Sequence, residues 1–243
     1  MVFDEKKKEK NLRNSLLKYD CIVVASKKSA NVFKNLFVGI KKTPKIVTFK
    51  YLKIDFVKKE LKNKNKDSIL IAPTNFYSFP DFSIQNYLFD LINKLLKNNY
   101  KVIYRPHPSN FKDKSINILR LNFKLNKNFI FDNNPEYFES YSKSKFLISD
   151  MSGTAYTYAV ITGRPVIFFN CCDKFLTKYN YNKLNYFRDR DKIGWKFSNV
   201  NKIIDFLNKN KNLKEKKLLS IKKLKINFIN EKKIDLNYLL KNV

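Results

Sequence analysis

The stretch FLISDMSGTAYTYAVITGRPVIFFNCC, residues 146–172, differs in composition from the rest of the chain. The whole chain is 29% charged, whereas this stretch carries only Asp150 and Arg164 as charged residues. A segment this apolar is expected to run through the interior of a sheet. It alternates strand, turn, helix and strand, with the Ser149–Thr154 turn directly after the first strand. Ligands of open α/β sheets bind beyond such strand ends, so the turn is a candidate site.

Short apolar runs alternate with segments of helical periodicity on both sides of this stretch. The runs that predict strands are residues 21–25, 45–49, 68–73, 101–104, 129–131, 146–148 and 165–169. The periodic segments that predict helices are residues 5–17, 27–37, 84–98, 135–143, 153–161 and 199–208. This alternation predicts an α/β fold, a parallel sheet with helices on both faces.

A Lys/Asn-rich linker at residues 58–66 divides the chain. We expect residues 1–60 to form an N-terminal α/β portion and residues 61–210 to form the main domain. Residues 211–243 are rich in lysine and predict a basic helical tail.

The Ser149–Thr154 turn has the residue types that bind phosphate. The helix that follows begins near Gly153, so its first N–H groups lack intrahelical partners and carry partial positive charge. Gly153 lets a ligand approach the backbone, and Ser152 and Thr154 add hydroxyl donors. The turn, with Ser149 and Asp150, therefore predicts a phosphate or diphosphate site. The alternative is that Asp150 or Ser152 only caps the helix.

Arg105-Pro-His107-Pro108 follows another predicted strand and contains the only histidine of the chain. The two prolines stiffen the loop around the imidazole. Arg105 is a candidate phosphate ligand, and His107 a candidate hydrogen-bond donor or proton-transfer group. A structural turn with a solvated histidine is the alternative. Thr74, after the strand at residues 68–73, is a weaker candidate at the same edge of the sheet.

Two further segments have simpler interpretations. Gly163-Arg164-Pro165 is typical of a helix C-cap followed by a strand. Residues 188–195 contain Arg188, Asp189, Arg190 and Asp191 and predict a charged loop that lines the site.

Composition excludes several classes of protein. With 44% hydrophobic residues the chain can bury a core, and without an apolar run of about 18 residues it has no transmembrane helix. Three cysteines without metal-ligand spacing favour reduced thiols in a cytoplasm and predict no metal site. The net charge of +29 fits an anionic membrane surface or nucleic acid, or compositional bias towards lysine.

RPHP at residues 105–108 and LISDMSGTAYTYAVITGRPVIFF at residues 147–169 resemble motifs of the CDP-glycerol glycerophosphotransferase family. The resemblance spans about residues 20–210. It implies a GT-B-like fold with a Rossmann-type C-terminal domain and a truncated N-terminal acceptor domain. It also implies a cytoplasmic enzyme, peripheral on the inner face of the plasma membrane, that transfers glycerol phosphate from CDP-glycerol to a lipid-linked or polysaccharide acceptor.

The resemblance also implies roles for individual residues. His107 and Arg105 would contact the donor diphosphate, with His107 assisting the leaving group. Asp150 would organise the turn, in which Ser152 and Gly153 take the place of paired serines. Thr157 stands where such turns commonly have an acidic residue for the ribose, which makes it a candidate nucleotide neighbour. The family's acceptor domain carries a second histidine that this chain lacks, so a separate chain supplying that domain is one possible partner.

Three functions therefore remain open. The first is transfer of glycerol phosphate from CDP-glycerol. The second is a GT-B glycosyltransferase that uses a nucleotide sugar. The third is a non-catalytic subunit that binds an anionic surface or nucleic acid. No cofactor is required by either reaction, although a diphosphate donor can bring Mg²⁺ with it.

Overall fold

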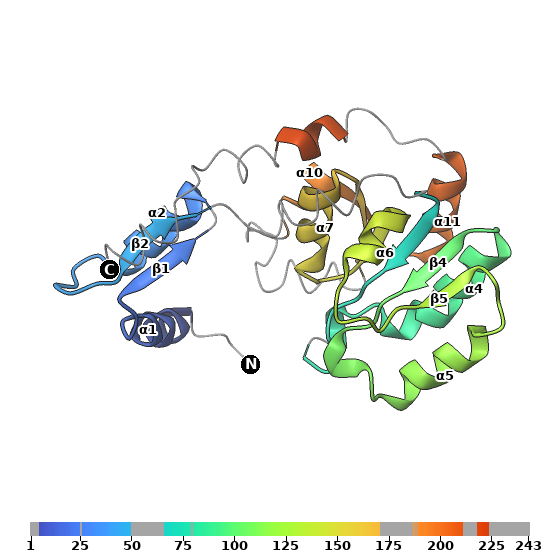
Figure 1. The fold of residues 1–243 in the computed structure, drawn as a ribbon, viewed down its shortest axis with the longest axis horizontal. Helices are drawn as coiled ribbons and strands as arrows, with labels where there is room; N and C mark the ends of the chain where they lie inside the picture. The colour runs from blue at the N-terminus through green and yellow to red at the C-terminus, as the bar shows by residue number, and fades with distance from the viewer. Residues whose placement is uncertain are drawn as a thin grey trace. The chain divides into compact units, whose positions relative to one another are not determined.

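The computed structural model describes residues 5–24, 26–49, 66–78, 80–170, 187, 189–210 and 218–223. These residues form two units, residues 5–49 and residues 66–223 (Figure 1). The boundary predicted near residue 60 lies outside the described residues, as does most of the predicted tail from residue 211 onward.

The first unit is a small βαβ arrangement. Its elements are α1 (Glu5–Leu16), β1 (Cys21–Val24), α2 (Lys27–Leu36) and β2 (Lys45–Thr48). The two strands are parallel, with Cys21 opposite Lys45, and α2 forms the crossover between them. Ser26 caps α2, because its Oγ accepts the Ser29 N–H at 3.1 Å. Both strands lie where the apolar runs predict them.

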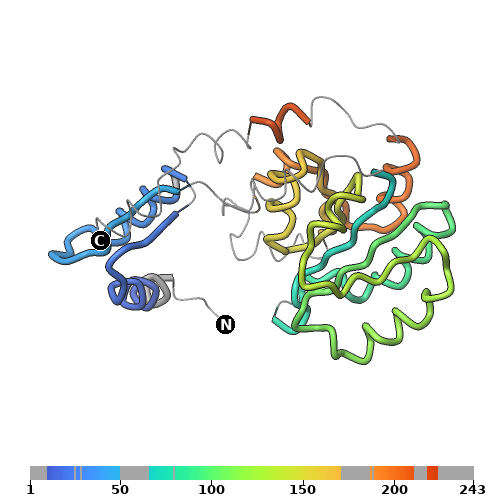
Figure 2. Tube along the Cα trace, viewed as in Figure 1, coloured from blue at the N-terminus to red at the C-terminus, as the bar shows by residue number. Residues whose placement is uncertain are grey.

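The second unit contains a six-stranded sheet in which every neighbouring pair is parallel. Its strands are β3 (Ser68–Ile71), β4 (Lys101–Tyr104), β5 (Phe129–Phe131), β6 (Ser144–Ser149), β7 (Val166–Phe169) and β8 (Gly194–Phe197). Their order is β5-β4-β3-β6-β7-β8, and Figure 2 follows the chain through them from teal to orange. Counted from β3, this is the Rossmann order 3-2-1-4-5-6.

Helices cover both faces of this sheet. They are α4 (Leu88–Lys97), α5 (Lys114–Phe123), α6 (Phe138–Lys143), α7 (Thr154–Thr162), α10 (Arg190–Ile193) and α11 (Val200–Lys209), with 3₁₀ turns η1 (Pro80–Phe82), η2 (Gln85–Tyr87) and η3 (Pro108–Asn110). Alternate strand residues such as Ile69 and Ile71 belong to one buried cluster with α4, α5 and α11. On the other face, α6 packs on β3, and α7 packs on β6 and β7. Burial on both faces explains why the strands are continuous apolar runs.

Two elements differ from the sequence prediction. Residues 194–197 form the edge strand β8 instead of continuing the predicted charged loop, and Arg188 lies outside the described residues. Gly194 is required there, because a Cβ would lie 1.9 Å from the Val166 carbonyl oxygen on β7. Helix α5 lies in a segment for which the sequence predicts no helix.

The Gly163-Arg164-Pro165 segment has the predicted capping role. Gly163 ends α7 with φ +70°, a left-handed conformation that favours glycine, and its N–H bonds the Ala159 carbonyl at 2.9 Å. Arg164 is buried and donates to the carbonyl oxygens at the end of α6, those of Tyr141, Ser142 and Ser144. No helix of the described residues is long and apolar enough to cross a membrane.

Candidate functional site

The strand order reverses between β3 and β6, where an open α/β sheet is expected to have a crevice. From β3 the chain continues outward to β4, and from β6 it continues in the opposite direction to β7, so the loops after these strands diverge. This reversal of strand order is where open α/β sheets bind nucleotides. Thr74, from the loop after β3, and the Ser149–Thr154 turn after β6 both lie at this reversal.

Asp150 joins the two sides of this crevice. Its Oδ1 accepts the Thr74 N–H at 2.8 Å, and its Oδ2 accepts the Ile84 N–H at 3.0 Å. The carboxyl group is buried, and this desolvation raises its pKa to about 6, although backbone hydrogen bonds from Ile84 and Thr74 oppose the shift. Asp150 therefore holds the loop after β3 against the Ser149–Thr154 turn through two buried hydrogen bonds.

Ser149 also lies beneath the turn. It is fully buried, and its hydroxyl donates to the Ala72 carbonyl oxygen at 2.6 Å. The prediction placed Ser149 among the diphosphate ligands, but this contact gives its hydroxyl a structural partner on the β3 side. The sequence could not distinguish the two because both roles suit a serine at a strand end.

The next residues form the start of α7. Ser152 Oγ accepts the Thr154 N–H at 3.3 Å, which is a capping contact, and Thr157 donates to the Gly153 carbonyl oxygen at 3.4 Å. Burial raises the pKa of Tyr141, and the neighbouring Thr154 side chain opposes this shift. The structure therefore shows the capping role of Ser152, and phosphate binding by its hydroxyl stays a prediction.

Gly153 supplies the open part of the turn. It is exposed, and a Cβ built on it would meet no atom within 4 Å. Its φ of −59° is available to any residue, so the backbone conformation does not require glycine. What glycine provides is an uncovered backbone at the N-terminus of a nine-residue helix, where partial positive charge favours an anion.

His107 is held by its own loop. The residue is half-buried, and its Nδ1 accepts the Ser109 N–H at 3.2 Å as the cap of η3. Because Nδ1 acts as an acceptor, the neutral imidazole carries its proton on Nε2. The side chain therefore presents an N–H donor, which suits a phosphate oxygen.

Two contacts tie the His107 loop to the loop after β3. Asn110 Nδ2 donates to Asn75 Oδ1 at 3.2 Å, and the Tyr77 hydroxyl makes a short hydrogen bond to the Asp113 carboxylate. The structure thus joins His107, Thr74 and the turn at the carboxyl edge of one sheet, as their positions after strands predict.

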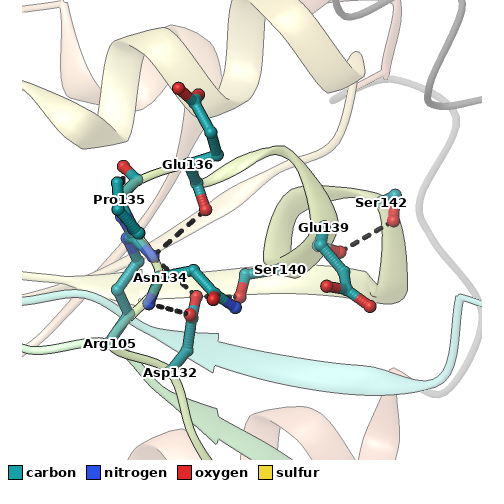
Figure 3. Close-up of polar contacts among 8 residues, drawn as sticks. All are labelled: Arg105, Asp132, Asn134, Pro135, Glu136, Glu139, Ser140 and Ser142. Atoms are coloured by element: carbon teal, nitrogen blue, oxygen red, sulfur yellow. Dashed lines mark hydrogen bonds and ion pairs between the residues drawn. The ribbon is translucent and has the colours of Figure 1, made fainter.

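Arg105 has a different set of partners from the one predicted. Its Nη1 lies 2.8 Å from Asp132 Oδ2 and 3.4 Å from the Glu136 carbonyl oxygen, and its Nη2 lies 3.3 Å from the Pro135 carbonyl oxygen (Figure 3). Asp132 also accepts the hydroxyl of Ser140. Arg105 therefore fastens the loop between β5 and α6 to the end of β4, and its predicted contact with a phosphate stays a prediction.

Arg190 is the cation that reaches the turn. It is 3% exposed, and its Nη2 donates to the Asp150 carbonyl oxygen at 3.0 Å while Nη1 donates to Asn170 at 2.6 Å. Its guanidinium lies 4.6 Å from the ring centroids of both Phe168 and Phe187. The sequence predicts Arg190 only as part of a charged loop, because nothing in the local sequence indicates that its side chain is buried.

The described residues contain no group of three His, Cys, Asp or Glu side chains that could hold a metal ion. Chemically, the site offers backbone N–H groups at a helix start, two hydroxyls, an imidazole N–H and a nearby guanidinium. These groups bind phosphate oxygens and stabilise negative charge.

Comparison with known proteins identifies relatives of this arrangement. The model of the CDP-Glycerol:Poly(glycerophosphate) glycerophosphotransferase family matches residues 1–232. The wall teichoic acid polymerase TagF is 21% identical, and the match covers 92% of this chain and 56% of that structure with a TM-score of 0.59. A variant of the same polymerase is 20% identical over 100% of this chain and 62% of that one, with a TM-score of 0.60. No curated protein matches the sequence.

A second kind of enzyme shares the fold. The UDP-GlcNAc 2-epimerase of Methanocaldococcus jannaschii, in complex with UDP-GlcNAc and UDP, is 16% identical, and the match covers 84% of this chain and 60% of that one with a TM-score of 0.50. These structures confirm the predicted fold class, an α/β fold whose parallel sheet matches the C-terminal part of GT-B enzymes. The matches cover 55–62% of the polymerase structures, so this chain corresponds to somewhat more than half of their length.

Proposed function

Because the chain belongs to the CDP-glycerol:poly(glycerophosphate) glycerophosphotransferase family, we propose that it binds CDP-glycerol and transfers its glycerol phosphate to a surface-polymer acceptor. A single observation carries the proposal. Asp150 bridges the β3 and β6 loops at the reversal of strand order and thereby presents the α7 N-terminus to the crevice. A nucleoside diphosphate is the ligand whose charge and size suit that position.

Each group of the site has a part in this proposal. The backbone at Gly153 and the hydroxyls of Ser152 and Thr154 bind the diphosphate oxygens. His107 donates its Nε2–H to the same diphosphate. Arg105 contributes indirectly, because it fixes the loop after β5 through Asp132. Thr157, one turn along α7, is the proposed neighbour of the nucleoside.

The proposed reaction is a displacement at phosphorus. An acceptor hydroxyl oxygen bonds to the β-phosphorus of CDP-glycerol, while the bond from that phosphorus to the bridging oxygen breaks and CMP leaves. The hydroxyl proton passes to a base on the acceptor side, and the charge on the departing CMP is stabilised by His107 and the start of α7. Phosphoryl transfer of this kind depends chiefly on positioning and charge neutralisation, which are what these groups provide.

The proposed acceptor is lipid-linked or a polysaccharide, and the proposed location is the cytoplasmic face of the plasma membrane. The family relationship and the net charge of +29 support an anionic membrane surface as partner. A separate chain that supplies an acceptor domain is a further proposed partner. The reaction requires no resident cofactor, and Mg²⁺ would arrive with the donor diphosphate.

A nucleotide sugar is the second candidate donor. The fold shared with an epimerase structure that contains UDP-GlcNAc favours it, because a diphosphate is common to both donors. A non-catalytic binding subunit is the third candidate. Release of CMP distinguishes the first from the other two.

The experiment incubates the chain with CDP-glycerol, or with UDP-sugars, and a glycerol phosphate oligomer as acceptor, and measures the nucleotide released. We expect CMP release from CDP-glycerol alone, falling by about 10²-fold or more in His107→Ala, as expected for loss of a catalytic donor. Ser152→Ala should lower turnover as well, and its folding is checked by circular dichroism. Unchanged turnover in both variants would rule out the proposed site.

A further inference from the structure

Helix α5 has apolar residues on two opposite sides. The side that packs into the core is formed by Ile116, Leu119 and Phe123. The outward side is formed by Ile118, which is 59% exposed, Leu121, which is 47% exposed, and Leu125, which is 91% exposed and lies just past the helix end. At 3.6 residues per turn, Ile118 and Leu121 fall on one stripe about half a turn from the buried one, and Leu125 follows two residues after the helix ends. We call them the outer stripe.

The outer stripe differs from ordinary scattered surface hydrophobics. Single exposed apolar residues are common in soluble proteins, whereas these three gather within one short segment on the side of α5 opposite its buried residues. Figure 1 shows α5 at the outer margin of its domain, beyond α4 and β5. Because Ile116, Leu119 and Phe123 pack into the core, the exposed stripe on the opposite side of α5 faces away from the sheet.

The charges around the outer stripe have one dominant sign. Between residues 112 and 131 the basic side chains are all exposed: Lys112, Lys114, Arg120, Lys124 and Lys127. The segment contains a single acidic residue, Asp113, whose carboxylate bonds Tyr77 and the Ser115 N–H. An apolar stripe within a basic surface complements a layer that is apolar inside and negatively charged at its face.

We propose that the outer stripe of α5 is a membrane-contact surface that inserts at the interface of an anionic lipid bilayer. The stripe is aliphatic, so it suits acyl chains, whereas single-stranded nucleic acid is bound by aromatic side chains on which bases stack. The inference deepens the membrane partner of the proposed function by naming its surface. It does not depend on which donor the site uses.

The contact would also bring lipid close to the site loops. Helix α5 begins seven residues after His107, with η3 between them. Ser115, in the first turn of α5, accepts a hydrogen bond from Gln85 Nε2 at 2.8 Å, so the helix start is fastened to the segment that follows β3. A lipid-linked acceptor lying in the same interface would then be near the carboxyl edge of the sheet.

The test is co-sedimentation of the full chain with vesicles of phosphatidylcholine alone or mixed with phosphatidylglycerol. The variant carries Ile118→Gln, Leu121→Gln and Leu125→Gln together. Its matched control is Leu219→Gln, because Leu219 is 58% exposed but lies outside the stripe. Since all four side chains are exposed, circular dichroism and thermal unfolding should match the wild type.

We expect the wild type and the control to bind the anionic vesicles, and the triple variant to lose at least about tenfold in partitioning, because three aliphatic side chains no longer leave water. Replacing the charge of Arg120 or of Lys124 by Arg120→Gln or Lys124→Gln should lower partitioning into the anionic vesicles about fivefold in each case. Equal binding by the triple variant and the wild type would overturn the inference, as would stripe-dependent binding to polynucleotide with no binding to vesicles. CMP release with a soluble acceptor should be the same in all these variants. Vesicle binding therefore tests the membrane-contact surface, and CMP release tests the proposed donor site separately.

Discussion

Replacing each of the two glycines that flank α7 should separate ligand binding from folding. Gly153 has a φ of −59° and open space where a Cβ would lie, so alanine fits without strain. Gly163 also has open space, but its φ of +70° disfavours every residue with a Cβ. Both variants add one methyl group, one at each end of the same helix.

The expected magnitudes follow from these conformations. Gly153→Ala should raise the free energy of unfolding by about 0.4–1 kcal/mol, because the unfolded chain loses conformational freedom. Gly163→Ala should lower it by about 1–2 kcal/mol, the cost of a left-handed conformation. For the donor, the Gly153 methyl group displaces at least one charge-assisted hydrogen bond to the diphosphate, worth about 1.5–3 kcal/mol, so affinity should fall by at least about tenfold. Affinity should be unchanged in Gly163→Ala.

The assay combines urea denaturation followed by circular dichroism with titration of CDP-glycerol. Weakened binding in a variant that folds at least as well as the wild type cannot be explained by lost stability. If Gly153→Ala bound the donor as tightly as the wild type, close approach of a diphosphate to the start of α7 would be refuted.

Three further predictions concern the buried charges. Asp132→Ala should lower the free energy of unfolding by about 3–5 kcal/mol, because it leaves Arg105 largely buried without its carboxylate, and a loss under about 1 kcal/mol in urea would contradict this. Arg190→Lys should weaken donor binding, because an ammonium group lacks the planar fork that bonds the Asp150 carbonyl and Asn170 together. If calorimetry gave the variant the donor affinity of the wild type, Arg190 would have no role in donor binding. For Asp150, the folded pKa of about 6 lies above the ordinary value of 3.8, so the native state binds the proton more tightly. Its contribution to stability is therefore full below pH of about 4 and lost as pH rises through about 6, by roughly 3 kcal/mol. Urea unfolding measured from pH 4 to pH 7 should show this loss of stability in the wild type and not in Asp150→Asn. If the free energy of unfolding changed with pH in the same way in both proteins, the raised pKa of Asp150 would be contradicted.

The central strands could be predicted because burial on both faces leaves a continuous apolar run. Strands such as β3 and β6 follow this rule, and the site residues after them share an edge because parallel strands end on the same side. The edge strand β8 could not be predicted in this way, since its sequence GWKF includes an exposed lysine and follows charged residues. Only its glycine, which lies against the β7 backbone, hints at the close packing.

Helix α5 was missed for a different reason. Its two apolar stripes, one buried and one exposed, cancel the single-sided periodicity by which an amphipathic helix is recognised. The feature that hides the helix in the sequence is thus the feature that indicates a second contact surface.

The roles of the arginines depend on contacts that no local pattern encodes. Arg105 follows a strand and precedes His107, which suits a phosphate ligand, yet its partner Asp132 lies 27 residues away in sequence. Arg190 reaches the Asp150 carbonyl from 40 residues away and is buried between two phenylalanines. The sequence predicts which edge of the sheet carries the site, while the tertiary structure shows which arginine lies against the Ser149–Thr154 turn.

The most direct measurement is calorimetric titration of the chain with CDP-glycerol, CMP and UDP-sugars, alongside His107→Ala. The proposal predicts that the cytidine nucleotides bind and that CDP-glycerol binding weakens by about tenfold or more when the imidazole donor to the diphosphate is removed. The half-buried position of His107 leaves the fold intact in the variant, which thermal unfolding verifies. Absence of binding by any of these nucleotides, or equal binding of CDP-glycerol by wild type and variant, would contradict a donor site between the His107 loop and the start of α7.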